Sequence, residues 1–222
     1  MLKSVAAVLF DLDGTLVDTI PLILACYGHT LAAHLPGYDP GRQAIIGNLG
    51  RSLDAILLDY ARAAGAPDPE ATSRAMIETY RSFQRVHLPR LIRPYDGIGE
   101  TLAGLRARGL TIGVVTSKVE WAARETYERY GIGEFLSVEV FHDDTERHKP
   151  DPEPLLLAAA KGGLDVARTV YVGDSVYDMA AGKAAGMRTV GALWGPNSRE
   201  ELLAAGADEL AEKPADLLAL LA

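Results

Sequence analysis

The chain has 222 residues, a formal net charge of -8 and hydrophobic side chains at 48% of its positions. This length and composition fit one larger domain that carries an insertion, and they exclude a disordered or fibrous protein. The acidic balance, with no run of lysine or arginine, argues against nucleic acid as the main partner, and the single cysteine excludes an internal disulfide.

The first predicted element is a buried strand at residues 5–10, where an apolar run ends in an Asp- and Gly-rich turn. This run is too short to span a membrane, and no signal-peptide cleavage pattern accompanies it. We therefore expect a cytoplasmic protein without a membrane partner. Its first strand should enter a loop at the carboxyl edge of a sheet.

Residues 19–93 are predicted to form an all-helical insertion. Amphipathic patterns without intervening strands occur at residues 22–35, 52–64 and 69–87. Pro89 and the turn Arg93-Pro94-Tyr95-Asp96-Gly97 mark the return to the main fold. Because the insertion starts just after the first acidic loop, we expect a helical cap that covers this loop.

The rest of the chain alternates between apolar runs and helical stretches. The runs lie at residues 110–116, 136–141, 169–173 and 188–191, and the helical stretches begin near Gly97, Val119, Pro152 and Val176. Such alternation is typical of βαβ units. The sequence therefore predicts an α/β fold with a doubly wound, parallel, Rossmann-like sheet. Residues 1–18 and 94–222 form this core, and residues 19–93 form the inserted all-helical cap domain.

The loops after the predicted strands carry the residues that suggest chemistry, because ligands of open α/β sheets bind outside the carboxyl ends of the strands. These residues are Asp11, Asp13, Thr116, Ser117, Lys149, Asp174 and Asp178. Clustered carboxylates repel one another unless a cation neutralises them, and hard oxygen ligands suit Mg²⁺. A phosphate held beside the metal would pair with the lysine and a hydroxyl. The set predicts phosphoryl chemistry.

Asp11 and Asp13 fit two complementary roles in that chemistry. An aspartate can attack phosphorus to give an acyl phosphate, while a carboxylate two residues on protonates the leaving oxygen and later activates water. We therefore predict Asp11 as the nucleophile and Asp13 as the general acid and base.

Four segments resemble, in order, the motifs of the haloacid dehalogenase-like hydrolase superfamily. They begin with Asp11-Leu-Asp-Gly-Thr and continue with Val114-Val-Thr-Ser-Lys, His148-Lys-Pro-Asp-Pro and Gly173-Asp-Ser-Val-Tyr-Asp. The likeness covers nearly the whole chain, and the insertion lies where the family places its first type of cap. Residues 145–155 and 194–208 are similar to the phosphoglycolate phosphatase-type branch, although His148 stands where the third motif often has glycine.

The resemblance implies the same catalytic roles for Asp11 and Asp13. It also implies a Mg²⁺ site formed by Asp11, Asp174 and the backbone carbonyl of Asp13, with Asp178 behind these ligands. Phosphate would be bound by Thr116, Ser117 and Lys149. Arg51 is a possible cap contact to a substrate carboxylate or second phosphate, and a surface arginine at a helix start is an equal alternative.

The function expected from these residues is hydrolysis of a small phosphorylated metabolite such as 2-phosphoglycolate. Dehalogenases of this superfamily lack an acid at the position of Asp13, so its presence favours phosphate esters. Three alternatives stay open, namely a phosphatase of sugar phosphates, nucleotides or pyrophosphate, a β-phosphoglucomutase-like enzyme, and a regulatory protein that binds a phosphorylated ligand without catalysis. Either a monomer or a homodimer is compatible with the sequence.

Overall fold

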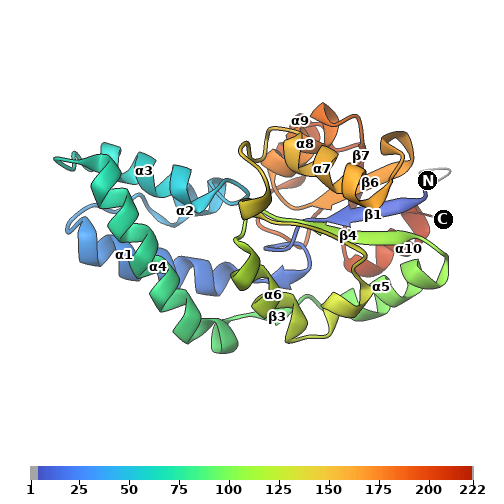
Figure 1. Cartoon of the computed structure of the whole chain (residues 1–222), viewed down its shortest axis with the longest axis horizontal. Helices are drawn as coiled ribbons and strands as arrows, with labels where there is room; N and C mark the ends of the chain where they lie inside the picture. Colours follow the sequence, from blue (N-terminus) through green and yellow to red (C-terminus); the bar gives the residue numbers. More distant parts are fainter. Residues whose placement is uncertain (1–4, 222) are drawn as a thin grey trace.

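The computed structural model describes residues 5–221, in which six parallel strands form the central sheet (Figure 1). Residues 1–4 and 222 of the predicted core lie outside the described residues. The strand order is β5-β4-β1-β6-β7-β8. The bounds are β1 (Ala7–Phe10), β4 (Thr111–Val115), β5 (Val138–Val140), β6 (Thr169–Gly173), β7 (Arg188–Ala192) and β8 (Glu209–Ala211). Phe10 pairs with Val114 and with Val172, so the three central strands end at the same edge.

Helices cover both faces of this sheet, as a doubly wound fold requires. Val8 and Phe10 point to the face covered by α5 (Ile98–Ala107), α6 (Glu120–Glu128) and α10 (Leu217–Leu220). Leu9 points to the opposite face, covered by α7 (Glu153–Gly162) and α8 (Val176–Ala184). The alternation follows the two-residue period of a strand. Together with α9 (Arg199–Ala204) beside β7, this arrangement confirms the predicted fold class.

The inserted segment is helical and lies beyond one end of the sheet (Figure 1). Its helices are α1 (Ile20–His34), α2 (Arg42–Gly47), α3 (Leu53–Ala63) and α4 (Pro69–Leu91). The ring of Tyr27 packs edge-on against Tyr60 and Tyr80, which joins α1 to α3 and α4. The chain enters this helical unit through β2 (Val17–Asp18) and returns to the core through β3 (Arg93–Pro94), and these two strands pair antiparallel.

The structure differs from the sequence prediction at two places in the insertion. Helix α2 was not predicted, because its six residues are too short to show an amphipathic period. Helix α4 continues past Pro89 to Leu91, since a proline in the last turn removes one helix hydrogen bond while the buried Leu88 keeps the turn packed.

Short 3-10 helices complete the described chain at Ile132–Phe135, His142–Asp144, Val166–Arg168 and Pro214–Asp216. The longest helix, α4, carries a polar and charged face along its length. Of the helices described between residues 5 and 221, none is both long and apolar enough to cross a membrane.

Candidate active site

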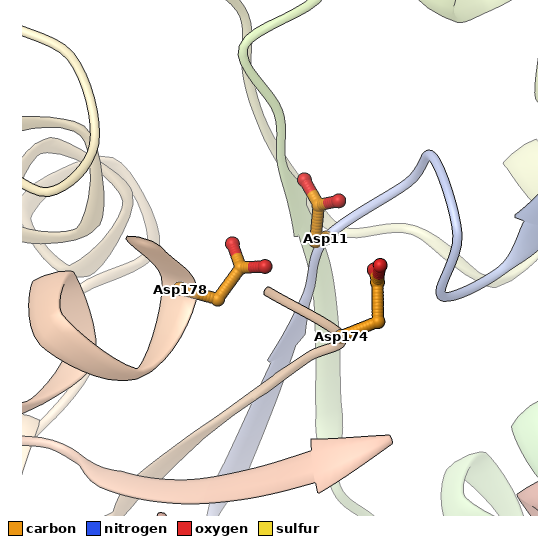
Figure 2. Close-up of side chains that lie close together, drawn as sticks. All are labelled: Asp11, Asp174 and Asp178. Atoms are coloured by element: carbon orange, nitrogen blue, oxygen red, sulfur yellow. The ribbon is translucent and has the colours of Figure 1, made fainter. Parts of the chain in front are cut away.

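Three buried carboxylates meet at the carboxyl edge of the sheet (Figure 2). Asp11 directly follows β1, Asp174 directly follows β6, and Asp178 lies in the first turn of α8. One oxygen from each lies within 4.8 Å of the others, and the residues are 4%, 2% and 0% exposed. Like charges held this close and away from water repel strongly, so the cluster needs cations.

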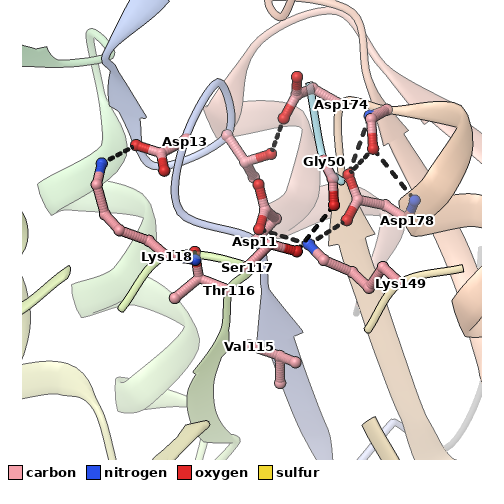
Figure 3. Close-up of polar contacts among 12 residues, drawn as sticks. Asp11, Asp13, Gly50, Val115, Thr116, Ser117, Lys118, Lys149, Asp174 and Asp178 are labelled. Atoms are coloured by element: carbon pink, nitrogen blue, oxygen red, sulfur yellow. Dashed lines mark hydrogen bonds and ion pairs between the residues drawn. The ribbon is translucent and has the colours of Figure 1, made fainter. Parts of the chain in front are cut away.

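Lys149 supplies one positive charge to this cluster (Figure 3). Its Nζ lies 2.7 Å from Asp11 Oδ1 and 2.7 Å from Asp178 Oδ1, and it donates to the Tyr171 hydroxyl at 3.0 Å. Burial alone would lower the pKa of Lys149, but the charges of Asp11 and Asp178 raise it well above its usual value. The lysine is therefore charged, and one lysine leaves the three carboxylates with excess negative charge.

The pKa values of two of the carboxyl groups are raised, first by burial and then by the neighbouring carboxylates. Burial raises the pKa of Asp11 from 3.8 to about 7, although Lys149 opposes the rise. Burial and the charges of Asp178 and Asp11 raise the pKa of Asp174 well above its usual value. Buried carboxylate oxygens with uncompensated negative charge are suitable ligands for a hard divalent cation such as Mg²⁺.

Nearby glycine, threonine and serine residues position the carboxylates of Asp174 and Asp178. A Cβ at Gly14, where φ is +88°, would lie 2.4 Å from Asp174 Oδ2, so only glycine leaves room for that carboxylate. The Thr15 hydroxyl donates to Asp174 Oδ1 at 2.6 Å. Asp178 Oδ2 accepts from the backbone N–H of Ser175 at 3.0 Å, which closes the capping box of α8 and frees Oδ1 for Lys149.

The Asp13 carboxylate lies apart from this cluster and pairs with Lys118 (Figure 3). Lys118 Nζ is 2.5 Å from Asp13 Oδ1, and the lysine side chain is only 7% exposed. Thr116 Oγ1 accepts from the Lys118 backbone N–H at 3.2 Å. The segment after β4 therefore contributes a hydroxyl and a cation beside the two aspartates of the first loop.

A cavity of about 100 Å³ separates these core residues from the helical insertion. The core lines it with Asp11, Asp13, Thr116, Ser117, Lys118, Val119 and His142. The insertion lines it with Ile20, Ile23, Tyr27, Leu49, Gly50, Arg51, Leu53, Asp54, Ile56, Tyr80, Arg81 and Gln84. A ligand in this cavity would contact both parts of the molecule.

Arg51, for which the sequence left a substrate contact and a surface position open, lines the cavity, and its guanidinium is hydrogen-bonded within the insertion. It donates to Asn48 Oδ1 at 2.7 Å and to Asp59 Oδ2 at 2.7 Å. A substrate anion would therefore compete with Asp59 for this side chain.

The insertion is closed over the core. The Ser117 hydroxyl donates to the Gly50 carbonyl oxygen at 2.8 Å, and a Cβ at Gly50 would lie 2.5 Å from Ser175 Oγ. His142 Nε2 lies 3.5 Å from Asp54 Oδ2. These contacts bring the loop before α3 and the first turn of α3 onto the carboxyl edge of the sheet.

Sequence reasoning did not single out Thr15, Lys118, Tyr171 or Gln84, which the structure places at the site or the cavity. The sequence carried a signal for Thr15 and Lys118, because Thr15 belongs to the Asp-Gly-Thr turn and Lys118 directly follows Ser117. Tyr171 lies inside an apolar strand, where no local signal marks it.

Comparison with known proteins relates this geometry to a family. The model of the haloacid dehalogenase-like hydrolases matches residues 8–192. A pyrophosphatase of Bacillus velezensis is 37% identical over 216 residues, covering 97% of this chain and 96% of that protein. An N-acetylmuramic acid 6-phosphate phosphatase of Pseudomonas aeruginosa is 37% identical over 218 residues, covering 97% and 94%. A solved structure from Lactobacillus plantarum, a candidate phosphoglycolate phosphatase, is 25% identical with a TM-score of 0.83, covering 98% and 100%.

Proposed function

The chain belongs to the haloacid dehalogenase-like hydrolase family and is a phosphatase of that family, and we propose that it hydrolyses a small phosphomonoester with Mg²⁺ through a phosphoryl group carried on Asp11. The observation that carries this proposal is the cluster of buried carboxylates around Lys149, next to a small cavity. The identity to the two bacterial phosphatases supports the reaction class.

Asp11 and Asp174 would hold Mg²⁺ through their carboxylates, with the backbone carbonyl of Asp13 as a further ligand. When bound, the ion supplies positive charge to the oxygens of the transferring phosphoryl group. Asp178 is fixed by Lys149 and Ser175, and it would hold Lys149 in position behind the ion. Lys149 and the Thr116 hydroxyl would bind the phosphate. Ser117 lines the same cavity, while its hydroxyl holds the insertion closed.

The reaction follows from the two aspartates of the first loop. A carboxylate oxygen of Asp11 forms a bond to phosphorus while the bond from phosphorus to the ester oxygen breaks. Asp13 gives its proton to that leaving oxygen. Asp13 then takes a proton from a water molecule that attacks the phosphoryl group, which releases inorganic phosphate and restores the Asp11 carboxylate. The contact with Lys118 keeps the Asp13 side chain at the cavity for both proton transfers.

The size of the cavity favours a small substrate. An engineered protein cavity of about 150 Å³ binds a molecule as small as benzene, and the cavity here is about 100 Å³. A phosphate with a two-carbon leaving group such as glycolate suits this volume better than a nucleotide or a sugar phosphate. Pyrophosphate is the second candidate, because it is equally compact and the Bacillus velezensis relative is a pyrophosphatase.

We also propose that residues 19–93 act as a cap domain on a core made of residues 1–18 and 94–222. Closure of this cap would exclude water while phosphate is transferred to Asp11. The contact between Ser117 and Gly50 supports such a closed state. The cytoplasmic location and the monomeric or dimeric state stay predictions.

Phosphate release with and without Mg²⁺ tests the proposed function. The substrates are 2-phosphoglycolate, pyrophosphate, glucose 6-phosphate and a nucleoside monophosphate, and Asp11→Asn is the control. We expect Mg²⁺-dependent hydrolysis that is fastest for one of the two small substrates and absent in the variant. Full activity of Asp11→Asn, or activity indifferent to Mg²⁺, would overturn the proposal.

A further inference from the structure

Gln84 is a polar residue in the apolar stripe of α4. The buried positions of this helix are Ser73, Met76, Tyr80, Gln84 and Leu88, a spacing of three or four residues that places them on one face. A side chain at position 84 therefore faces the interior, where an aliphatic residue would pack without cost. Instead the position holds an amide with two donors and an acceptor.

The Gln84 side chain is nearly buried, and its amide has no hydrogen-bond partner among residues 5–221. Gln84 as a whole is only 5% exposed, and its amide is not among the fully buried atoms without a partner, so it keeps access to the cavity that it lines. No hydrogen bond joins it to another residue between 5 and 221. An amide that reaches a cavity without a partner in the protein can form its hydrogen bonds with water or with a bound ligand. Its donors and its acceptor are therefore available to a ligand in that cavity.

The placement of Gln84 matches that of a group which contacts the leaving group of the substrate. Asp11, Asp13 and Thr116 line the cavity from the core, whereas Gln84 lines it from the insertion. A phosphate bound at Asp11 has its leaving group in the remaining part of this cavity. The core would then bind the phosphate, and α4 would contact the leaving group.

The charged side chains near Gln84 form no hydrogen bond with its amide. Arg81 lines the same cavity from the preceding turn of α4, and its Nη2 lies 4.0 Å from Asp54 Oδ1. Both of these side chains are more than a third exposed, so they balance one another at the rim. Arg81 Nε is buried without a partner among the described residues, and this positively charged neighbour of Gln84 favours an oxygen acceptor in the cavity.

We propose that Gln84 is a specificity-determining residue whose side-chain amide donates a hydrogen bond to an acceptor oxygen of the leaving group. The inference rests on the proposed function, and it adds the cap residue that recognises the leaving group. A carboxylate or a second phosphate offers such an oxygen, whereas methyl phosphate has a leaving group with no second polar atom.

The test compares two substrates in the same protein. The measured quantity is the ratio of kcat/KM for the faster of 2-phosphoglycolate and pyrophosphate to kcat/KM for methyl phosphate. We expect Gln84→Leu to lower this ratio about tenfold, the usual effect of losing a hydrogen bond to a charged oxygen. Gln84→Glu should lower it at least as much, because a carboxylate repels an acceptor oxygen.

Thermal unfolding separates a ligand contact from damage to the helix. Without ligand, Gln84→Leu should not lower Tm, since the amide makes no hydrogen bond to another described residue and leucine keeps the apolar packing of α4. Ser73→Ala is the matched control, because Ser73 is 5% exposed on the same stripe and does not line the cavity. The control should keep the wild-type ratio.

Three results would overturn the assignment. The first is that the wild type is active and Gln84→Leu has the same ratio of kcat/KM values as the wild type. The second is that Ser73→Ala lowers this ratio as much as Gln84→Leu does. The third is a Gln84→Leu variant that loses stability together with the ratio, since this would show a structural role. A wild type that hydrolyses no substrate would instead refute the proposed function, and the inference would fall with it.

Discussion

Replacing Asp11 by asparagine tests the electrostatic cost of the buried carboxylates. Asparagine has nearly the same shape, and its amide oxygen can still accept the hydrogen bond that Lys149 Nζ now donates at 2.7 Å. The substitution therefore removes a negative charge while keeping the packing. Without metal, we expect the variant to be more stable than the wild type at neutral pH and equally stable in acid.

The magnitude follows from the pKa of Asp11. Burial raises the pKa of the Asp11 carboxyl group from 3.8 to about 7, so the folded protein binds the carboxyl proton more tightly than the unfolded chain does. Stability is then lost as pH rises from 3.8 towards about 7, and the loss at about pH 7.5 is on the order of 4 kcal/mol. For a chain of this length that corresponds to a difference in Tm of about 10 °C between variant and wild type.

Thermal unfolding of both proteins in a chelating buffer, from about pH 4.5 to about pH 7.5, measures this difference. Mg²⁺ should narrow the difference at the higher pH, because it stabilises the wild-type cluster more than the variant. The reasoning would be refuted by a variant that is less stable than the wild type at every pH. A difference in Tm that does not change with pH would refute it equally.

Three further substitutions test individual parts of the site. Asp13→Asn should lower kcat about 10²–10⁴-fold with little change in KM, as steady-state kinetics would show, because it removes the proton donor. Lys149→Met should abolish activity and lower the free energy of unfolding, measured in urea without metal, by about 3–5 kcal/mol, since it leaves buried carboxylates unpaired. An unchanged free energy of unfolding would contradict this. Gly50→Ala should lower kcat/KM at least tenfold, because its Cβ would lie 2.5 Å from Ser175 Oγ and hold the insertion open. Gly47→Ala, which meets no atom within 4 Å, should keep wild-type activity, and equal losses in both would refute the steric argument.

The sequence was sufficient to predict the core because each strand carries its own signal. The apolar run before Asp11 and the run before Asp174 are fully buried parallel strands. Their pairing places Phe10 opposite Val172, so the acidic residues that follow must share one edge. This rule of parallel sheets brings the carboxylates together without any knowledge of distances.

Contacts across the cavity could not be predicted in the same way. The pair between Asp13 and Lys118 joins residues 105 positions apart, and it depends on how two loops turn after their strands. The unpartnered state of Gln84 depends on how α4 lies over the core. For Arg51 the sequence left a substrate contact and a surface position as equal alternatives, and its pairing with Asp59 follows from the turn between α2 and α3.

Mass spectrometry of acid-quenched protein tests most directly whether Asp11 carries phosphate during turnover. Asp13→Asn is mixed with Mg²⁺ and 4-nitrophenyl phosphate, whose leaving group departs without a proton, so that loss of the base slows chiefly the hydrolysis of the phosphorylated enzyme. We expect a phosphoryl group on the peptide that contains Asp11, and none in a protein that also carries Asp11→Asn. Phosphate on a different residue, or turnover of the wild-type protein with no phosphorylated form in either protein, would contradict the mechanism.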